Sequence, residues 1–326
     1  MSDRPCVLVF SGADPSGGAG MAADIQAITA MGAHALPVLT AITVQDNNRV
    51  HAVMPVAPEV LLQQARTLLA QVPVAAIKIG IPGSAENAKA IAQLIGEMRA
   101  THRQAAGAAP AWAHKLYSEP PVVLDPVLRS GNGDALGRDD AVRALAPLLP
   151  LATLITPNGP EAAALAAGAR QAAVARATPA VAGAAVSAVA SSAPGPDAGR
   201  SLAGDAGALG GHGHPAWRGT PHGNALAHAH ALRALGCRHV LVTGGHDEDS
   251  DLVINRWLGP DRQQNWSWPR LPGSFHGSGC TLAAAVAALL ALGDTMAQAL
   301  SKAQGYTQRA LAASYAIAPG QRIPQR

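Results

Sequence analysis

Short runs of aliphatic and β-branched residues alternate along the chain with longer patterns rich in alanine and leucine, and this alternation constrains the fold most. Runs typical of strands lie at 6–10, 35–43, 75–80, 121–125, 153–156, 239–243 and 251–257. Patterns typical of helices lie at 18–31, 59–71, 85–99, 139–149, 224–236, 279–292 and 294–316. Continuously apolar strands are buried on both faces, so the sheet is expected to be mostly parallel with helices on either side. The sequence therefore predicts a three-layer α/β/α sandwich, formed as one domain over residues 1–326.

Composition and charge limit the class of protein. Of the 326 residues 48% are hydrophobic, and 24 basic against 21 acidic side chains give a net charge of +3. A net charge this small does not indicate that the protein binds nucleic acid. The chain starts without the apolar core of a signal peptide, and its longest apolar run is shorter than the roughly 20 residues that span a bilayer. The three cysteines (Cys6, Cys237 and Cys280) are too few and too far apart for a disulfide framework. We expect a soluble, cytoplasmic protein with no membrane partner.

A low-complexity stretch interrupts the alternation at 168–223. It consists largely of Ala, Gly, Ser, Pro and His, and it has too few large apolar side chains to offset the entropy of ordering. We expect it to be a disordered insertion within the domain. A smaller stretch of this kind lies at 101–119. The histidines of the longer stretch do not predict a metal site, because a His-rich linker needs no metal.

The polar, glycine-rich loops all follow the carboxyl ends of predicted strands. They read SGADPSGGAG, DPVLRSGNGD, TPNGPE and TGGHDED, after the first, fourth, fifth and sixth strand runs. In parallel α/β sheets, ligands bind outside the carboxyl ends of the strands. The sequence therefore predicts a ligand cleft at this edge of the sheet.

The first of these loops is open enough for a small molecule to lie against the backbone. Four glycines between Gly12 and Gly20 surround Asp14, and Asp24 follows in the next helix. The alternative is a flexible loop in which Asp14 caps the helix. Four glycines are more than a cap needs, so a binding loop is favoured.

The sequence HGSGCT predicts a second glycine-rich turn, which opens an apolar helix and places Cys280 in its first turn. Free N–H groups and the helix dipole make such a turn an anion site. A thiol there has a lowered pKa, so we expect Cys280 to accept a proton from an attacking hydroxyl. The alternative is a small helix residue without a role, and the turn alone does not decide between them.

At two further places in the sequence, side chains with oxygen atoms could bind a metal ion. Asn158 and Glu161 lie three residues apart at a helix start, where they can hold Mg²⁺ beside phosphates or form a capping box. Asp125 ends a buried strand, where its carboxylate either faces the cleft or belongs to a turn before Pro126.

Two predicted strands contain polar side chains for which the sequence allows two roles each. Gln45 ends a strand, and its amide can donate to and accept from a heteroaromatic ring edge, although it may equally be read as a surface glutamine. Lys78 lies inside an apolar strand, where it either serves a phosphate or extends to the sheet edge.

Six motifs in this order resemble the hydroxymethylpyrimidine/phosphomethylpyrimidine kinases of thiamine biosynthesis, which belong to the ribokinase-like superfamily. The motifs are GADPSGGAGMAADIQAITAMGAHALPVLTAITVQ, KIGIPGSAEN, VVLDPVLRSGNGDAL, LITPNGPEAAAL, VLVTGGHDED and FHGSGCTLAAAVAAL. The resemblance covers nearly all of the chain except 101–119 and 168–223. It implies a ribokinase-like fold, a homodimer, and phosphorylation of 4-amino-5-hydroxymethyl-2-methylpyrimidine with ATP and Mg²⁺.

The resemblance also implies roles for particular residues. The pyrimidine side is expected to include Gly12, Asp24, Gln45 and Ile81. ATP and its phosphates are expected at Asn158, Thr243, Gly245 and Ser278, and the metal at Asp125 and Glu161. Gly277 and Gly279 are expected to stabilise the transferring group, with Cys280 as the base. Most ribokinase-like enzymes have aspartate at this last position, and cysteine resembles the pyrimidine-kinase branch and its pyridoxal-phosphorylating relatives.

The chain departs from the family pattern at three positions. Thr243 and Arg129 stand where many members have lysine, and Ile81 stands where many have methionine. The first two leave open whether the monophosphate is phosphorylated in a second step. Two alternatives also stay open, a pyridoxal kinase on the same scaffold and a pyrimidine-binding regulator without catalysis. Asn158, Glu161 and Cys280 argue against a regulator, because a binder needs neither a base nor residues that organise a metal.

Overall fold

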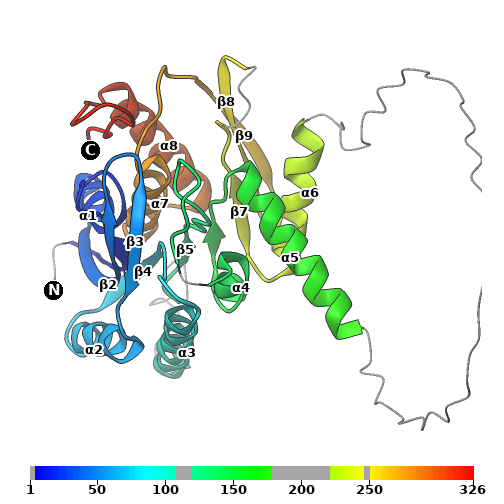
Figure 1. Cartoon of the computed structure of the whole chain (residues 1–326). Helices are drawn as coiled ribbons and strands as arrows, with labels where there is room; N and C mark the ends of the chain where they lie inside the picture. The colour runs from blue at the N-terminus through cyan, green and yellow to red at the C-terminus, as the bar shows by residue number, and fades with distance from the viewer. Residues whose placement is uncertain (1–3, 108–118, 138, 178–220, 246–249) are drawn as a thin grey trace, which may run out of the picture.

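A nine-stranded sheet organises the computed structural model, which describes residues 4–107, 119–137, 139–177, 221–245 and 250–326 (Figure 1). The strands are β1 (Cys6–Ala13), β2 (His34–Gln45), β3 (Val50–Pro55), β4 (Val74–Ile79), β5 (Val122–Leu124), β6 (Leu154–Ile155), β7 (His239–Val242), β8 (Leu252–Leu258) and β9 (Gln263–Pro269). The helices are α1 (Gly20–Ala30), α2 (Pro58–Leu69), α3 (Ala85–Gly107), α4 (Ala141–Leu145), α5 (Gly159–Ala177), α6 (Pro221–Ala234), α7 (Ser278–Ala291) and α8 (Met296–Ala312).

The strand order is β3-β2-β1-β4-β5-β6-β7-β8-β9, and the six strands from β2 to β7 in this order are parallel. The predicted α/β class and the mostly parallel sheet are therefore confirmed. Strands β3 and β9 add antiparallel edges that the sequence did not predict. The residues of β9 alternate between exposed and partly buried positions, and those of β3 are exposed or partly buried, so neither strand has the fully buried pattern of a central strand.

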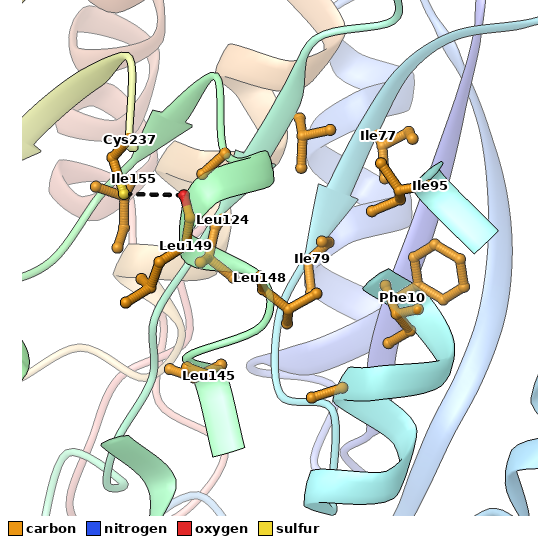
Figure 2. Close-up of a cluster of buried hydrophobic side chains, with 14 of the residues drawn as sticks. Phe10, Ile77, Ile79, Ile95, Leu124, Leu145, Leu148, Leu149, Ile155 and Cys237 are labelled. Carbon is orange, nitrogen blue, oxygen red and sulfur yellow. Dashed lines mark hydrogen bonds between the residues drawn. The ribbon is translucent and has the colours of Figure 1, made fainter. Parts of the chain in front are cut away.

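The alternation of side chains along β1 separates the two layers of helices. Val7 and Val9 face a buried cluster with α1, α7 and α8, and Leu8 and Phe10 face a second cluster with helices α2 to α6. Figure 2 shows part of the second cluster, where the Cys237 thiol donates a hydrogen bond to the main-chain carbonyl of Leu149 (3.2 Å). Burial raises the pKa of this thiol to about 12. All three cysteines are free, as the sequence predicted.

Helix α7 is buried along most of its length. Ten consecutive residues from Thr281 to Leu290 are buried, because α7 lies under the sheet with α1 and α8 beside it. Burial inside the protein explains why the longest apolar run of the sequence occurs here. Among the described helices, none combines the length and apolar character needed to cross a membrane.

The structure corrects several predicted boundaries. Helix α4 ends at Leu145 rather than 149, because Pro147 has no N–H for a helical hydrogen bond, and a short 3₁₀ turn follows at Leu149–Leu151. Helix α3 continues to Gly107, into the stretch predicted to be irregular from 101. The expected insertion at 168–223 is helical at both ends, since α5 reaches Ala177 and α6 starts at Pro221. The rest of that prediction, 178–220, lies outside the described residues.

A buried histidine makes stability depend on pH. The indole N–H of Trp257 donates to His239 Nδ1 (3.3 Å), and burial, with Arg238 and Arg233 adding repulsion, lowers the pKa of His239 to about 4. The unfolded chain therefore binds more protons between about pH 6.5 and pH 4, so His239 stabilises the fold above this window and loses that effect as the pH falls through it.

We predict that His239→Asn loses less free energy of unfolding between pH 7 and pH 4.5 than the parent chain does, by about 1–2 kcal/mol after allowance for partial solvent exposure. Asparagine cannot become charged, which is the physical reason. Urea unfolding at several pH values measures the difference, with exposed His34→Asn as the matched control. Equal slopes for the parent and both variants would contradict the prediction.

Candidate active site

A cavity with a volume of about 550 Å³ opens at the carboxyl edge of the parallel strands. It is bordered by the ends of β1, β2, β4, β5, β6 and β7 and by the start of α7. Its lining includes nearly all of the residues singled out in the sequence, namely Gly12, Gln45, Ile81, Asp125, Asn158, Glu161, Thr243, Gly245, Gly277, Ser278, Gly279 and Cys280. The predicted ligand cleft at this edge is therefore present.

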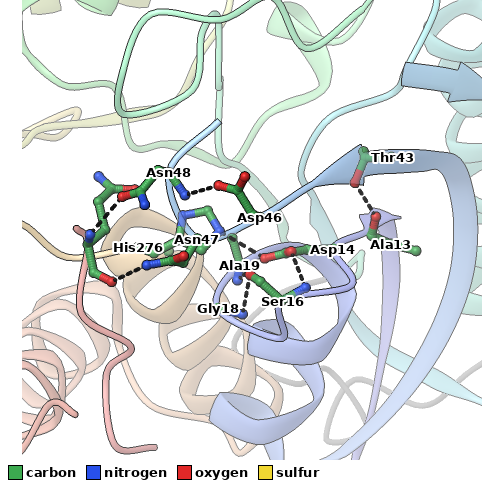
Figure 3. Close-up of polar contacts among 12 residues, drawn as sticks. Ala13, Asp14, Ser16, Gly18, Ala19, Thr43, Asp46, Asn47, Asn48 and His276 are labelled. Atoms are coloured by element: carbon green, nitrogen blue, oxygen red, sulfur yellow. Dashed lines mark hydrogen bonds and ion pairs between the residues drawn. The ribbon is translucent and has the colours of Figure 1, made fainter. Parts of the chain in front are cut away.

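Asp14 orders the first glycine loop (Figure 3). Its carboxylate accepts hydrogen bonds from the main-chain N–H groups of Ser16 (2.8 Å) and Ala19 (2.7 Å), and it lies 2.9 Å from Nε2 of His276. Burial by itself raises the pKa of Asp14, but hydrogen bonds from His276, Ser16 and Gln45 outweigh it and hold the pKa well below its usual range. Asp14 is therefore a carboxylate that joins the glycine loop to the turn before α7.

The turn before α7 meets the glycine loop so closely that only glycine fits. Gly277 has a left-handed backbone (φ 76°), and a Cβ atom there would lie 2.1 Å from the carbonyl oxygen of Gly18. A Cβ atom on Gly18 would in turn lie 2.3 Å from the ring of His276. The N-terminus of α7, with Ser278, Gly279 and Cys280, lines the same cavity as this loop and lies next to it.

A fully buried ion pair lies beneath the cavity. Lys78 Nζ is 2.8 Å from Asp24 Oδ1 and 4.0 Å from Asp125 Oδ2, and neither Lys78 nor Asp24 has any exposed surface. The prediction that Asp24 contacts the substrate is therefore wrong, because its carboxylate is directed at Lys78 and does not line the cavity. The sequence left two roles open for Lys78, contact with a phosphate or extension to the sheet edge. The structure fits neither role, because the side chain reaches neither the cavity surface nor the sheet edge.

The charge state predicted for Cys280 is also wrong. Burial, with Asp125 and Asp24 adding repulsion, raises the pKa of its thiol to about 12, although the ammonium group of Lys78 opposes the rise. The helix N-terminus was expected to favour the thiolate, but desolvation outweighs it. In the structure the thiol is therefore neutral at physiological pH.

Asn158 and Glu161 form a reciprocal pair at the start of α5. The Glu161 N–H donates to Asn158 Oδ1 and the Asn158 N–H donates to Glu161 Oε2, both at 2.9 Å. This is the capping-box geometry that the sequence left open as an alternative. Burial, with a contribution from the Asp125 charge, raises the pKa of Glu161 to about 7. Burial also raises the pKa of Asp125, whose Oδ2 atom has no hydrogen-bond partner among the described residues.

Several residues of the cavity were missed by the sequence analysis. Asn255 on β8 accepts a hydrogen bond from Gly244 N–H (2.9 Å) and donates to Gln304 Oε1 on α8 (2.8 Å). Trp268 on β9 donates to the same oxygen (3.1 Å). These side chains line the same cavity as Gly245. No sequence signal pointed to them, because they lie within strands and a helix rather than in glycine-rich loops.

The fold and the site are those of a phosphotransferase, the class to which the comparisons assign the chain. One cavity is lined by a glycine loop, by a helix start of the kind that binds anions, and by the carboxylates of Asp125 and Glu161. The chain belongs to the phosphomethylpyrimidine kinase family, whose model matches residues 14–104, 100–189 and 219–324.

Curated relatives agree with this assignment, and solved structures match the fold. The chain is 31% identical to the hydroxymethylpyrimidine/phosphomethylpyrimidine kinase of Rhizobium meliloti, over 96% of this chain and 93% of the relative. It is 30% identical to the Escherichia coli protein of the same name, over 97% and 94%. A Bacillus subtilis pyridoxal kinase structure, solved as an ADP complex, matches with a TM-score of 0.70 at 22% identity, over 99% and 97%. A Clostridium difficile phosphomethylpyrimidine kinase matches with a TM-score of 0.62 at 23%, over 93% and 98%. At these identities the structures show the fold alone.

We predict that Lys78→Met destabilises the protein by about 3–5 kcal/mol, because it leaves the Asp24 carboxylate buried without its partner. The double variant Lys78→Met/Asp24→Leu removes both charges and should recover most of this loss. Urea unfolding of the parent, the two single variants and the double variant gives the coupling free energy. A double variant no more stable than Lys78→Met would show that the ion pair is not the cause.

Proposed function

We propose that this kinase transfers the terminal phosphoryl group of ATP to the primary alcohol of 4-amino-5-hydroxymethyl-2-methylpyrimidine. The observation that carries the proposal is that Gln45 at the end of β2 and Cys280 in the first turn of α7 line one cavity. An amide suited to a ring edge and an anion-binding turn therefore face the same space. The similarity to curated hydroxymethylpyrimidine/phosphomethylpyrimidine kinases over nearly the whole chain supports the same substrate.

We assign two groups of cavity residues to the two substrates. Gly12 and Ile81 line the cavity together with Gln45, and a Cβ atom on Gly12 would lie 2.7 Å from the Ile81 side chain. The apolar surface of this group suits a flat pyrimidine ring. Gly245 and Trp268 also line the cavity, next to the Asn255–Gln304 hydrogen bond, and we assign them to the nucleotide base of ATP.

Asp125 and Glu161 are the residues that would hold Mg²⁺. Both line the cavity, both are carboxylates whose pKa is raised, and the buried Oδ2 atom of Asp125 lacks a hydrogen-bond partner among the described residues. Oxygen ligands of this kind fit Mg²⁺. When bound, the ion offsets negative charge on the phosphate oxygens. Asn158, held by Glu161, orders the same helix start.

The protein's own groups account for positioning and charge stabilisation during transfer. The N–H groups at the start of α7 lie where negative charge develops on the phosphoryl oxygens. We assign to Cys280 the acceptance of the proton from the substrate hydroxyl. The thiolate form of Cys280 takes up this proton and becomes the thiol, so the raised thiol pKa limits the step to the small ionised fraction near neutral pH.

A second phosphorylation, of the monophosphate to the pyrophosphate, is a separate part of the proposal. Arg129 lines the cavity, where it supplies a guanidinium in place of the family's lysine, and its Nη1 donates to the Gly133 carbonyl (2.9 Å). A guanidinium binds phosphate oxygens as a fork, so the change from lysine retains a phosphate ligand.

The proposed assembly is a homodimer that covers the β2–β3 hairpin. Ile42, Val44 and Met54 are each between 45% and 49% exposed, and Ile42 is paired with Met54 across the two strands. A second copy of the same chain would bury these apolar side chains. Sedimentation equilibrium distinguishes the dimer from a monomer, and a monomer at micromolar concentration would refute it.

The proposed reaction is tested by coupled measurement of ADP release from Mg-ATP with one acceptor at a time. We expect kcat/KM for the hydroxymethyl pyrimidine to exceed that for pyridoxal at least about tenfold, or about 1.4 kcal/mol in the barrier. The monophosphate, offered alone, shows whether the second step occurs. ADP release that no pyrimidine acceptor stimulates above the acceptor-free rate would refute the proposal, and faster turnover of pyridoxal would reassign the substrate.

We predict that Cys280→Ala lowers kcat roughly 10²–10⁴-fold, the usual contribution of a positioned base, while KM for both substrates stays near normal. Because the thiol pKa is raised, its basic form becomes more abundant as the pH rises, so kcat should increase towards alkaline pH. Cys280→Asp should recover part of the rate and reach its plateau at a lower pH. Steady-state kinetics from pH 6 to pH 9.5 measure both effects. An alanine variant with full kcat would leave Cys280 as a helix residue without a role.

A further inference from the structure

Residues 321–326 pack against the turn that opens α7. Phe275 and Arg322 form a parallel bridge, in which His276 N–H donates to the Arg322 carbonyl and Arg322 N–H donates to the Ser274 carbonyl, both at 2.9 Å. On its other side the segment pairs with the chain after α8, where Ile323 and Tyr315 exchange two main-chain hydrogen bonds. Ile323 is only 2% exposed. The segment is thus fixed to the active-site turn by its main chain and its apolar side chain.

The side chain of Arg326 reaches from this segment to both glycine-rich elements of the site. Its Nη2 atom donates to the carbonyl oxygens of Gly18, in the first loop, and of Gly277, at the start of α7 (3.4 Å for Gly277). Its Nε atom donates to Thr281 Oγ1 (2.8 Å), and its Nη1 atom donates to Gln26 Oε1 on α1 (3.3 Å). One guanidinium therefore connects the loop, the turn, α1 and α7.

The Arg326 guanidinium lies where the first glycine loop and the turn before α7 approach each other closely. The Gly18 and Gly277 carbonyl oxygens both lie within hydrogen-bond distance of one guanidinium nitrogen, so two partial negative charges meet there. A positive charge between them removes their repulsion. All four acceptors of Arg326 are uncharged oxygens, so none of these contacts neutralises the guanidinium.

The Gly277 carbonyl is held by the same group of contacts. Thr281 donates to it through both its main-chain N–H (2.9 Å) and its hydroxyl (2.8 Å), while the hydroxyl oxygen accepts from Arg326. The orientation of this peptide sets the first turn of α7, whose residues Ser278, Gly279 and Cys280 line the cavity. Loss of the Arg326 side chain would therefore alter the hydrogen bonds of Gly277 and Thr281, and through them the position of the N–H groups in the first turn of α7.

We propose that Arg326 is a positioning residue for phosphoryl transfer, which holds the glycine loop and the start of α7 at their working separation and places a positive charge behind the anion site. The inference rests on the proposed kinase function of this turn. It differs from that proposal because Arg326 does not line the cavity and acts through Gly18, Gly277 and Thr281.

The test compares Arg326→Ala with Arg322→Ala. Arg322 belongs to the same segment, but its guanidinium bonds to Ser314, away from the turn, so it controls for loosening of the segment. We expect Arg326→Ala to lower kcat at least about tenfold, or about 1.4 kcal/mol in the barrier. KM for ATP and for the acceptor should stay within about threefold, because the lost contacts act mainly on the transition state. Arg322→Ala should keep kcat within about twofold.

Chemical rescue separates positioning from general stability. Millimolar methylguanidinium should restore part of kcat in Arg326→Ala and leave Arg322→Ala unchanged, because only the first variant leaves a guanidinium-shaped space beside two carbonyls. Arg326→Lys retains the charge and should lie between the parent and Arg326→Ala, which keeps the test usable if the alanine variant unfolds. An unchanged kcat in Arg326→Ala, or equal losses in both alanine variants without rescue, would overturn the proposal.

The outcome can be separated from that of the proposed substrate. The measurements use whichever alcohol the parent enzyme phosphorylates, since Arg326 contacts the turn and not the acceptor. If the parent phosphorylates pyridoxal but not the pyrimidine, the substrate assignment fails while the comparison of Arg326 with Arg322 stands.

Discussion

The buried Lys78–Asp24 ion pair is the interaction on which the floor of the active site depends. It joins the interior of β4 to α1 with no exposed surface on either side chain, and Asp125 lies 4.0 Å from the same ammonium group. Two carboxylates therefore share one buried cation. Burial, with neighbouring carboxylates adding repulsion, raises the pKa values of Asp125, Glu161 and the Cys280 thiol around this pair.

The roof of the cavity depends on a contact between two glycine-rich segments far apart in the sequence. The backbone of Gly277 approaches Gly18 too closely for any side chain. Asp14 and His276 join the two segments on one side, and Arg326 joins them on the other. Because α7 is buried along most of its length, its first turn is fixed relative to the sheet. The anion site therefore requires little rearrangement to form, which is the condition for electrostatic stabilisation of a transition state.

Sequence patterns predicted the central strands best, because the side chains of these strands are buried on both faces of the sheet. Continuous apolar runs identified β1 and the other central strands, because a strand covered by helices on both faces has no polar side to show. The edge strands β3 and β9 were missed because their faces differ in exposure. The same limit applies to the site. Loop residues such as Asn158 were found because polar, glycine-rich loops after strands mark the carboxyl edge, whereas Trp268 and Gln304 lie within regular elements and have no such sequence signal.

The sequence by itself determined the order of the central strands and of the helices, the edge of the sheet at which the ligand cleft lies, and the residue types that gather there. Only the tertiary structure decided which of those groups reach the cavity and in what charge state. Asp24 and Asp125 both belong to sequence motifs at this edge, yet Lys78 holds the first away from the cavity and leaves the second within it. Cys280 is neutral although it begins a helix. Burial and through-space charge set both outcomes, and they depend on residues brought together only by folding.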